Sequence, residues 1–230
     1  MTMIPDRLQM VRQRMLEACA RHGRDPSSVQ LLAVSKTHGR EMIEAAYRAG
    51  QTVFGENYVQ EAVEKITALH HLPLQWHCIG PIQSNKTRLV SEHFDWIHTV
   101  DRLKIAQRLS EQRPLSIAPL QVCIQVNVDG GATKSGVVPA DALALGQAVR
   151  ELPRLQLRGL MCIPEPAPDF EASCILFKRV RALFASLNAQ GLELDTLSMG
   201  MSADLEAAIA SGSTMVRVGS AIFGERHYPA

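Results

Sequence analysis

The sequence predicts one α/β domain over residues 1–230, a single (β/α)8 barrel of the TIM type, and three observations indicate it. Short β-branched or apolar runs alternate with longer helical patterns along the chain, as in parallel strands joined by crossover helices. Eight such runs can be counted, which favours a closed barrel over an open doubly wound sheet. The length of 230 residues agrees, because single barrels typically have about 200 to 250 residues.

The elements follow from these runs in order. Strands are expected at residues 29–35, 52–54, 75–79, 96–99, 120–128, 155–162, 194–198 and 215–218. Helices are expected at residues 41–49, 58–70, 86–93, 102–112, 139–151, 170–190 and 203–211. Before the first strand, an additional helix is expected because apolar residues recur at helical spacing, namely Leu8, Val11, Met15, Leu16 and Cys19.

Glycine and proline support these boundaries. Gly50 and Gly191 follow helical patterns directly before the next strand, where a glycine commonly ends a helix. Pro139 stands at an expected helix start, where its missing N–H does no harm. Three prolines within residues 164–168 exclude both helix and strand there, and this segment is expected to be the loop after the sixth strand.

Composition excludes several classes of function. A formal net charge of +1, with both signs mixed along the chain, argues against a nucleic-acid surface or a polybasic membrane patch. The five cysteines are scattered and never spaced as Cys-x-x-Cys, so neither a disulfide framework nor a metal site is expected. No run reaches the roughly 20 apolar residues of a membrane span, and the start lacks a signal-peptide core. A cytoplasmic protein is expected.

In a barrel of this kind the chemistry belongs at the carboxyl ends of the strands. Lys36 directly follows the apolar first strand. It either extends into solvent or points into the mouth of the barrel, where desolvation would favour the neutral amine that attacks an aldehyde.

Two further segments could hold an anion. Ser202 closes the segment SMGMS and is placed to cap the helix that follows, whose first-turn N–H groups favour negative charge. Asp204 weakens this argument by supplying a negative charge of its own. Gly219 and Ser220 end the eighth strand, and in these barrels the loops after the last two strands are the usual phosphate site.

Arg217 lies two residues before Gly219 and should share the inward face of the eighth strand. A buried guanidinium needs a partner, either a ring nitrogen that accepts a hydrogen bond or a carboxylate such as Glu56.

The other strand-end residues are less specific. Asn57 and Asn127 could bind a ligand or tie loops together, and His77 and His98 could be core or rim histidines. Met161, Met199 and Met201 could flank a flat ring or simply fill the barrel.

Five ordered motifs make the chain resemble the pyridoxal 5′-phosphate (PLP) homeostasis protein family, from the first helix to the last strand. They are LLAVSK ending at Lys36, FGENY around Asn57, WHCIGPIQSNK from Trp76 to Lys86, SMGMS from Ser198 to Ser202, and VRVGSAIFG from Val216 to Gly224. Members of that family are single-domain relatives of the N-terminal barrel of alanine racemase, which is PLP fold type III.

The resemblance implies PLP as the cofactor and gives roles to the matching residues. Lys36 would form the Schiff base, and Arg217 would face the pyridine nitrogen. Ser202, Gly219 and Ser220 would hold the phosphate. Asn57, His77 and Met199 would line the same pocket.

A carrier of PLP, which buffers the aldehyde and delivers it to PLP-dependent apo-enzymes, is the expected function. A donor-only arginine leaves the ring nitrogen unprotonated, which weakens the cofactor as an electron sink. Racemisation also needs an acid–base group on each face of the ring. Lys36 can serve one face, and Tyr58 is the tyrosine expected nearest the mouth for the other. The alternatives are a low-activity amino-acid racemase and a Schiff-base aldolase that uses Lys36 without PLP. A monomer is expected, and a secondary PLP site at a lysine such as Lys134 stays open.

Overall fold

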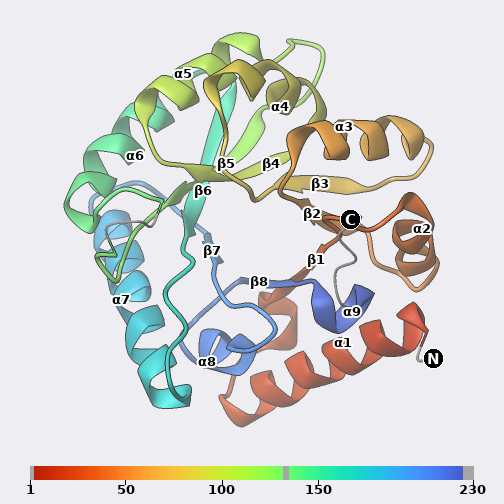
Figure 1. The fold of residues 1–230 in the computed structure, drawn as a ribbon. Coiled ribbons are helices and arrows are strands. Elements are labelled where there is room, and N and C mark those ends of the chain that lie inside the picture. Colours follow the sequence, from red (N-terminus) through yellow and green to blue (C-terminus); the bar gives the residue numbers. More distant parts are fainter. Residues whose placement is uncertain (1–2, 132–134, 225–230) are drawn as a thin grey trace.

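The computed structural model describes residues 3–131 and 135–224, and in them eight parallel strands close into a barrel surrounded by helices (Figure 1). Consecutive strands pair in order, and the last strand pairs with the first. The strands are β1 (Gln30–Val34), β2 (Val53–Glu56), β3 (Gln75–Cys78), β4 (Trp96–Val100), β5 (Leu120–Gln125), β6 (Leu155–Met161), β7 (Thr196–Ser198) and β8 (Met215–Val218).

The α-helices of this part of the chain form the outer layer. They are α1 (Ile4–Arg21), α2 (Arg40–Arg48), α3 (Val59–Ala68), α4 (Thr87–His93), α5 (Leu103–Gln112), α6 (Ala142–Arg150), α7 (Phe170–Ala189), α8 (Leu205–Ala210) and α9 (Ser220–Phe223). Short 3-10 turns occupy Pro26–Ser28, Ser84–Lys86 and Pro139–Asp141. Helix α1 packs against α2, α8 and α9, and so covers the side of the barrel where β8 meets β1 (Figure 1).

The expected barrel is confirmed, with differences at several element boundaries and one additional helix. The fifth strand ends at Gln125, because Val126 turns to bridge Val137 beyond it. Pro139 begins a 3-10 turn, and the α-helix itself starts at Ala142. The short helix α9 was not expected. Residues 164–168 are neither helix nor strand, as their prolines predict.

Alternation along each strand divides the apolar residues into two layers. Leu31 and Ala33 of β1 belong to the large cluster between strands and helices. Leu32 and Val34 belong to a separate cluster with residues of β2 and β8. Since successive side chains of a strand point to opposite faces, this second cluster fills the inside of the barrel, and Lys36 continues the same inward series.

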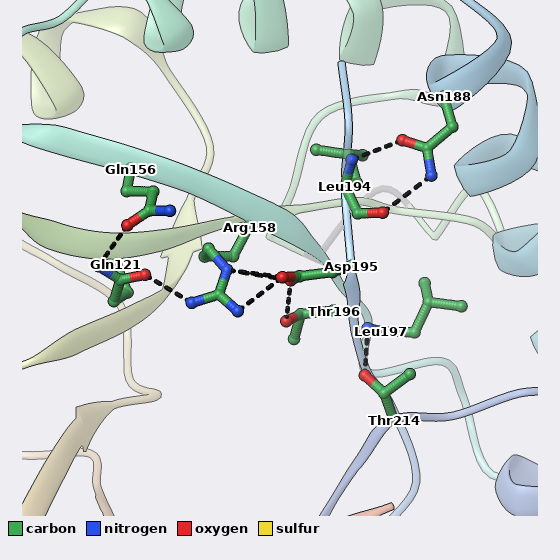
Figure 2. A network of polar contacts seen from close by, with 9 residues as sticks. All are labelled: Gln121, Gln156, Arg158, Asn188, Leu194, Asp195, Thr196, Leu197 and Thr214. Carbon is green, nitrogen blue, oxygen red and sulfur yellow. Dashed lines mark hydrogen bonds and ion pairs between the residues drawn. The ribbon is translucent and has the colours of Figure 1, made fainter. Parts of the chain in front are cut away.

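Polar side chains cover the amino end of the barrel (Figure 2). Arg158 donates from Nη1 to Oε1 of Gln121 at 2.7 Å and from Nη2 to Oδ2 of Asp195 at 2.6 Å. Its guanidinium lies 4.9 Å from the ring centre of Trp96, which packs inside the barrel.

Within the described residues, the helices are too short or too polar to span a bilayer.

Candidate functional site

A cavity of about 290 Å³ opens at the carboxyl end of the barrel, beside the ends of β1, β2 and β8. Six of the eight residues predicted for the site line it: Lys36, Asn57, Ser202, Arg217, Gly219 and Ser220. These residues are far apart in the sequence, and they meet because the carboxyl ends of all strands in a parallel barrel lie on one face.

A second cavity, of about 410 Å³, lies at the opposite end between α1 and the starts of β1 and β2. Its charged lining residue is Arg12, which donates to the carbonyl oxygens of Ala49 and Gly50 at 2.9 Å. Arg12 caps the carboxyl end of α2 through these contacts. The cavity therefore offers few groups that could bind or react with a ligand.

Lys36 reaches the mouth because of the strand that precedes it and the unusual turn that follows. It is half-buried and follows the inward-facing Leu32 and Val34 at the spacing of a strand. Thr37 then has a φ of +66°, a left-handed conformation that is uncommon for a β-branched residue. Backbone strain of this kind persists only where surrounding contacts hold it.

Arg217 is 4% exposed and points into the barrel. Its Nη1 donates to Oγ of Ser198 at 2.8 Å, and its Nη2 donates to the carbonyl oxygen of Cys162 at 2.9 Å. Burial lowers its pKa from the usual value, but a guanidinium keeps its proton in proteins. Two contacts therefore hold the fork in place at the edge of the cavity, which Arg217 lines.

The alternative of an Arg217–Glu56 ion pair is wrong. Glu56 is fully buried and accepts hydrogen bonds from Oγ of Ser35 at 2.7 Å and from Nζ of Lys65 at 2.8 Å. The physical reason is the alternation along β2, which directs Glu56 outward toward α3 while Arg217 points inward.

His77 does not line the cavity. It is fully buried inside the barrel, where its ring stacks on Trp96 at 5.2 Å between centroids. Its Nδ1 lies 2.9 Å from Nε2 of His98, and Nδ1 of His98 lies 2.8 Å from Oγ of Ser198. The core-histidine interpretation therefore describes both rings, and His77 reaches Arg217 only through His98 and Ser198.

Burial keeps both imidazoles neutral. It lowers the pKa of His77 to about 3 and the pKa of His98 well below its usual value. These two side chains therefore act as hydrogen-bonding groups at neutral pH and not as cations.

The three methionines occupy different places. Met199 is fully buried in the cluster between strands and helices, so it faces away from the barrel interior and is not among the residues that line the cavity. Met161 packs inside the barrel against Trp96 and Cys123. Met201 is 41% exposed and lines the cavity, which makes it the methionine of the three that can contact a ligand there.

Ser202 lines the cavity, but its expected role as a helix cap is wrong. Helix α8 starts at Leu205 with Asp204 as its N-cap residue, and the carboxylate of Asp204 accepts from the backbone N–H of Met201 at 2.6 Å. The carbonyl oxygen of Ser202 instead accepts from Nη2 of Arg14 in α1 at 3.1 Å. This contact ties the turn before α8 to α1.

Gly219 lies against the first strand. A Cβ atom on this residue would come within 3.1 Å of the carbonyl oxygen of Val34, which is tighter than side chains normally pack. A glycine lets the turn from β8 to α9 approach β1 closely, and this brings Ser220 to the edge of the cavity near Lys36.

Sequence reasoning missed His38, which lines the cavity and stacks on Phe223 at 5.3 Å between centroids. Its place two residues after Lys36 was the available signal. Tyr58 is 51% exposed and lines a neighbouring cavity that shares Asn57. Asn127 ties its own loop together, since its amide donates to the carbonyl oxygen of Gly131. Lys134 lies outside the described residues.

Three buried polar atoms near the mouth have no hydrogen-bond partner within the described ranges. They are Oγ1 of Thr37, Oε2 of Glu56 and Oδ1 of Asn57. Native proteins satisfy most buried polar atoms, so each exception needs an explanation. Of these three residues, Asn57 lines the cavity, so a ligand bound there would supply the partner that its Oδ1 lacks.

Comparison with known proteins agrees with this geometry. The family model for the alanine racemase N-terminal domain matches residues 8–227. The pyridoxal phosphate homeostasis protein of Pseudomonas aeruginosa is 57% identical over 230 residues, which cover 100% of this chain and 99% of that protein. The Escherichia coli K12 protein of the same name is 52% identical over 228 residues, covering 98% and 97%.

A solved structure shares the architecture. PipY of Synechococcus elongatus, solved with PLP bound, superposes with a TM-score of 0.83 at 40% identity and covers 96% of this chain and 100% of its own. The chain belongs to the pyridoxal phosphate homeostasis protein family, which is built on the fold of the alanine racemase N-terminal domain.

Proposed function

We propose that residues 1–230 act as one PLP-binding barrel that holds the cofactor as a Schiff base on Lys36 and buffers or delivers it to apo-enzymes. The observation that carries this proposal is that one cavity is lined by a lysine, a donor-only arginine and the small-residue turns after the last two strands. The names of the relatives and the PLP bound to PipY support the choice of cofactor.

The residues present fit the chemical groups of PLP. An aldehyde requires an amine, which Lys36 supplies. A phosphate requires hydroxyl and backbone N–H donors, which Ser202, Gly219 and Ser220 supply. The pyridine nitrogen and the ring hydroxyl require polar partners, which Arg217 and Asn57 supply, and Oδ1 of Asn57 is otherwise without a partner within the described ranges.

Neither His77 nor Met199 contacts the cofactor in this proposal. His77 acts through His98 and Ser198, which hold Arg217. Met199 supports the turn before Ser202 from the helical side of β7.

The arginine also favours carrying over catalysis. PLP is a strong electron sink when its ring nitrogen is protonated. Arg217 can only donate at that position, so the bound cofactor activates an amino acid weakly. Lys36 would condense with the aldehyde carbon with loss of one water. Addition of water would return the free amine and the aldehyde, whereas addition of another amine would free Lys36 and leave the cofactor bound to that amine.

A low-activity amino-acid racemase is the second candidate, and His38 is the observation that favours it. His38 is a titratable side chain at the cavity, and racemisation needs a second acid–base group besides Lys36. Circular dichroism of L-alanine incubated with the PLP-loaded protein measures this activity directly. Sustained turnover would contradict the carrier function and support the racemase.

Spectroscopy tests the Schiff base. Protein mixed with PLP is expected to absorb near about 420 nm, and borohydride is expected to remove the band and fix the label on the peptide that contains Lys36. Lys36→Ala is expected to remain folded and colourless, whereas Lys104→Ala, on the exposed face of α5, is expected to behave as wild type. A label on another lysine would contradict the proposal.

Delivery has its own test. An apo-enzyme that depends on PLP is expected to be activated by the loaded protein, with a time course different from that of free PLP at the same concentration. Size-exclusion chromatography with light scattering is expected to report a monomer. Activation at the rate at which the loaded protein releases PLP into solution would contradict direct delivery and leave buffering as the function.

A further inference from the structure

A buried charge cluster lies directly behind Lys36, on the outer face of β1 and β2 beneath α3. Lys65 of α3 is only 8% exposed. Its Nζ donates to the carbonyl oxygen of Ser35 at 2.9 Å, to Oε1 of Glu56 at 2.8 Å and to Oε1 of Glu61 at 2.5 Å. The three donors of the ammonium group are thus all used, by one backbone oxygen and two carboxylates.

The cluster holds the residues on both sides of Lys36. Ser35 is bound twice, since its hydroxyl donates to Oε1 of Glu56 at 2.7 Å and its carbonyl oxygen accepts from Lys65. Thr37 is bound through its backbone N–H, which donates to Oε1 of Glu61 at 2.7 Å. Lys36 is therefore the residue between two anchored neighbours.

The same contacts explain the backbone at Thr37. Its φ of +66° costs conformational energy in a β-branched residue, and such strain is kept only where surrounding interactions compensate it. The hydrogen bond from Thr37 to Glu61 is one of these interactions. The turn carries the chain away from the outer face, and it leaves Lys36 on the side of the cavity.

Stability alone is a weak reason for this arrangement. Burying an ion pair costs desolvation free energy that its attraction often does no more than offset, and apolar replacements are often as stable. Burial raises the pKa of Glu56, while Lys65 acts in the opposite direction. The cluster carries a desolvation cost and lies directly against Lys36, which indicates that its role is to position this residue.

We propose that Lys65, Glu56 and Glu61 form a positioning cluster for Lys36, which fixes the backbone on both sides of it so that its amine approaches the PLP aldehyde in a productive direction. This inference rests on the proposed function. The cluster contributes no atom to the reaction: the amine nitrogen of Lys36 bonds to the aldehyde carbon, and the aldehyde oxygen leaves as water.

The test compares two glutamates of one helix. Glu61→Ala removes the acceptor that Thr37 and Lys65 share, in a half-buried position where α3 tolerates alanine. Glu64→Ala makes the same change three residues later on the exposed side of α3. Stopped-flow absorbance near about 420 nm is expected to show Schiff-base formation slowed by about ten- to a hundredfold in Glu61→Ala and unchanged in Glu64→Ala.

Pyridoxine 5′-phosphate separates positioning from binding, because it carries the ring and phosphate of PLP without the aldehyde. Titration calorimetry is expected to give the same affinity for this analogue in wild type and Glu61→Ala, with the same far-ultraviolet circular dichroism. Equal rates in the two variants would overturn the proposal, and so would a parallel loss of analogue affinity in Glu61→Ala. A wild-type protein that binds the analogue but never forms the band would instead refute the Schiff base itself.

Discussion

His77 and His98 contact each other inside the barrel, with 2.9 Å between Nδ1 of His77 and Nε2 of His98, and this contact fixes the protonation of both rings. Arg217 can only donate, so Oγ of Ser198 accepts from it and donates its own O–H to Nδ1 of His98. His98 then donates to His77, and His77 donates to Oε1 of Gln75 at 3.1 Å. This assignment satisfies every donor and acceptor along the chain.

Ser198 connects this chain to Arg217, so its hydroxyl affects both stability and binding. We predict that Ser198→Ala lowers the free energy of unfolding by about 1–3 kcal/mol, because buried groups on both sides lose a partner. PLP affinity is expected to fall with it, since Arg217 loses one of its two contacts. Urea denaturation and fluorescence titration measure the two effects. Ser186→Ala, exposed on α7, serves as the control and should change neither.

The neutral histidines predict how stability depends on pH. The pKa of His77 is about 3 in the folded protein and about 6.5 when unfolded, so between these values the unfolded state binds the extra proton. Stability therefore falls as the pH drops below 6.5, by at most about 1.4 kcal/mol per pH unit for each such histidine. The window for the measurement is pH 5 to 8.

His77→Phe tests this dependence, because phenylalanine can still stack on Trp96 but cannot titrate. Urea denaturation at several pH values is expected to give a smaller slope for His77→Phe than for wild type. Burial raises the pKa of Glu56 and acts in the opposite direction, so the comparison uses the difference between the two proteins. His71→Asn, at an exposed position, should keep the wild-type slope, and an equal slope in His77→Phe would contradict the prediction.

The close approach of Gly219 to β1 predicts that a single methyl group disturbs the site. Gly219→Ala places a Cβ atom 3.1 Å from the carbonyl oxygen of Val34, and relieving such overpacking costs about 1–3 kcal/mol. Because the turn that shifts also carries Ser220, PLP affinity is expected to fall by about tenfold. The matched change Gly39→Ala would meet only the flexible end of Glu41, and its affinity should stay at the wild-type value.

Arg158 at the amino end is expected to contribute to stability without affecting the ligand (Figure 2). Arg158→Met leaves Oε1 of Gln121 without its donor and removes the ion pair with Asp195, which keeps a hydrogen bond from the hydroxyl of Thr196. The change should lower the free energy of unfolding by about 1–3 kcal/mol. PLP affinity should remain within about twofold, because the ligand end of the barrel is the other one. Arg88→Met removes an exposed ion pair with Glu92 and should cost no more than about 0.5 kcal/mol.

Much of the site followed from position along the chain. Lys36 and Arg217 could be assigned to the mouth because each ends or follows an apolar strand, and parallel strands deliver their carboxyl ends to one face. Ser202 was assigned to the right loop with the wrong local role, because Asp204 competes for the first turn of α8 and starts the helix later. Local propensity did not distinguish between two capping residues two positions apart.

The sequence by itself determined the order of strands and helices, since their periodicity is a local property of the chain. Only the tertiary structure decided which face of a strand each polar residue occupies and which distant residue it meets. Lys65 looks like any lysine of a surface helix until α3 packs over β1 and β2 and buries its ammonium group against Glu56. His77 and His98 become a pair only through the register between β3 and β4. Such contacts depend on how strands are offset around a closed barrel, and that offset is set by all eight strands together.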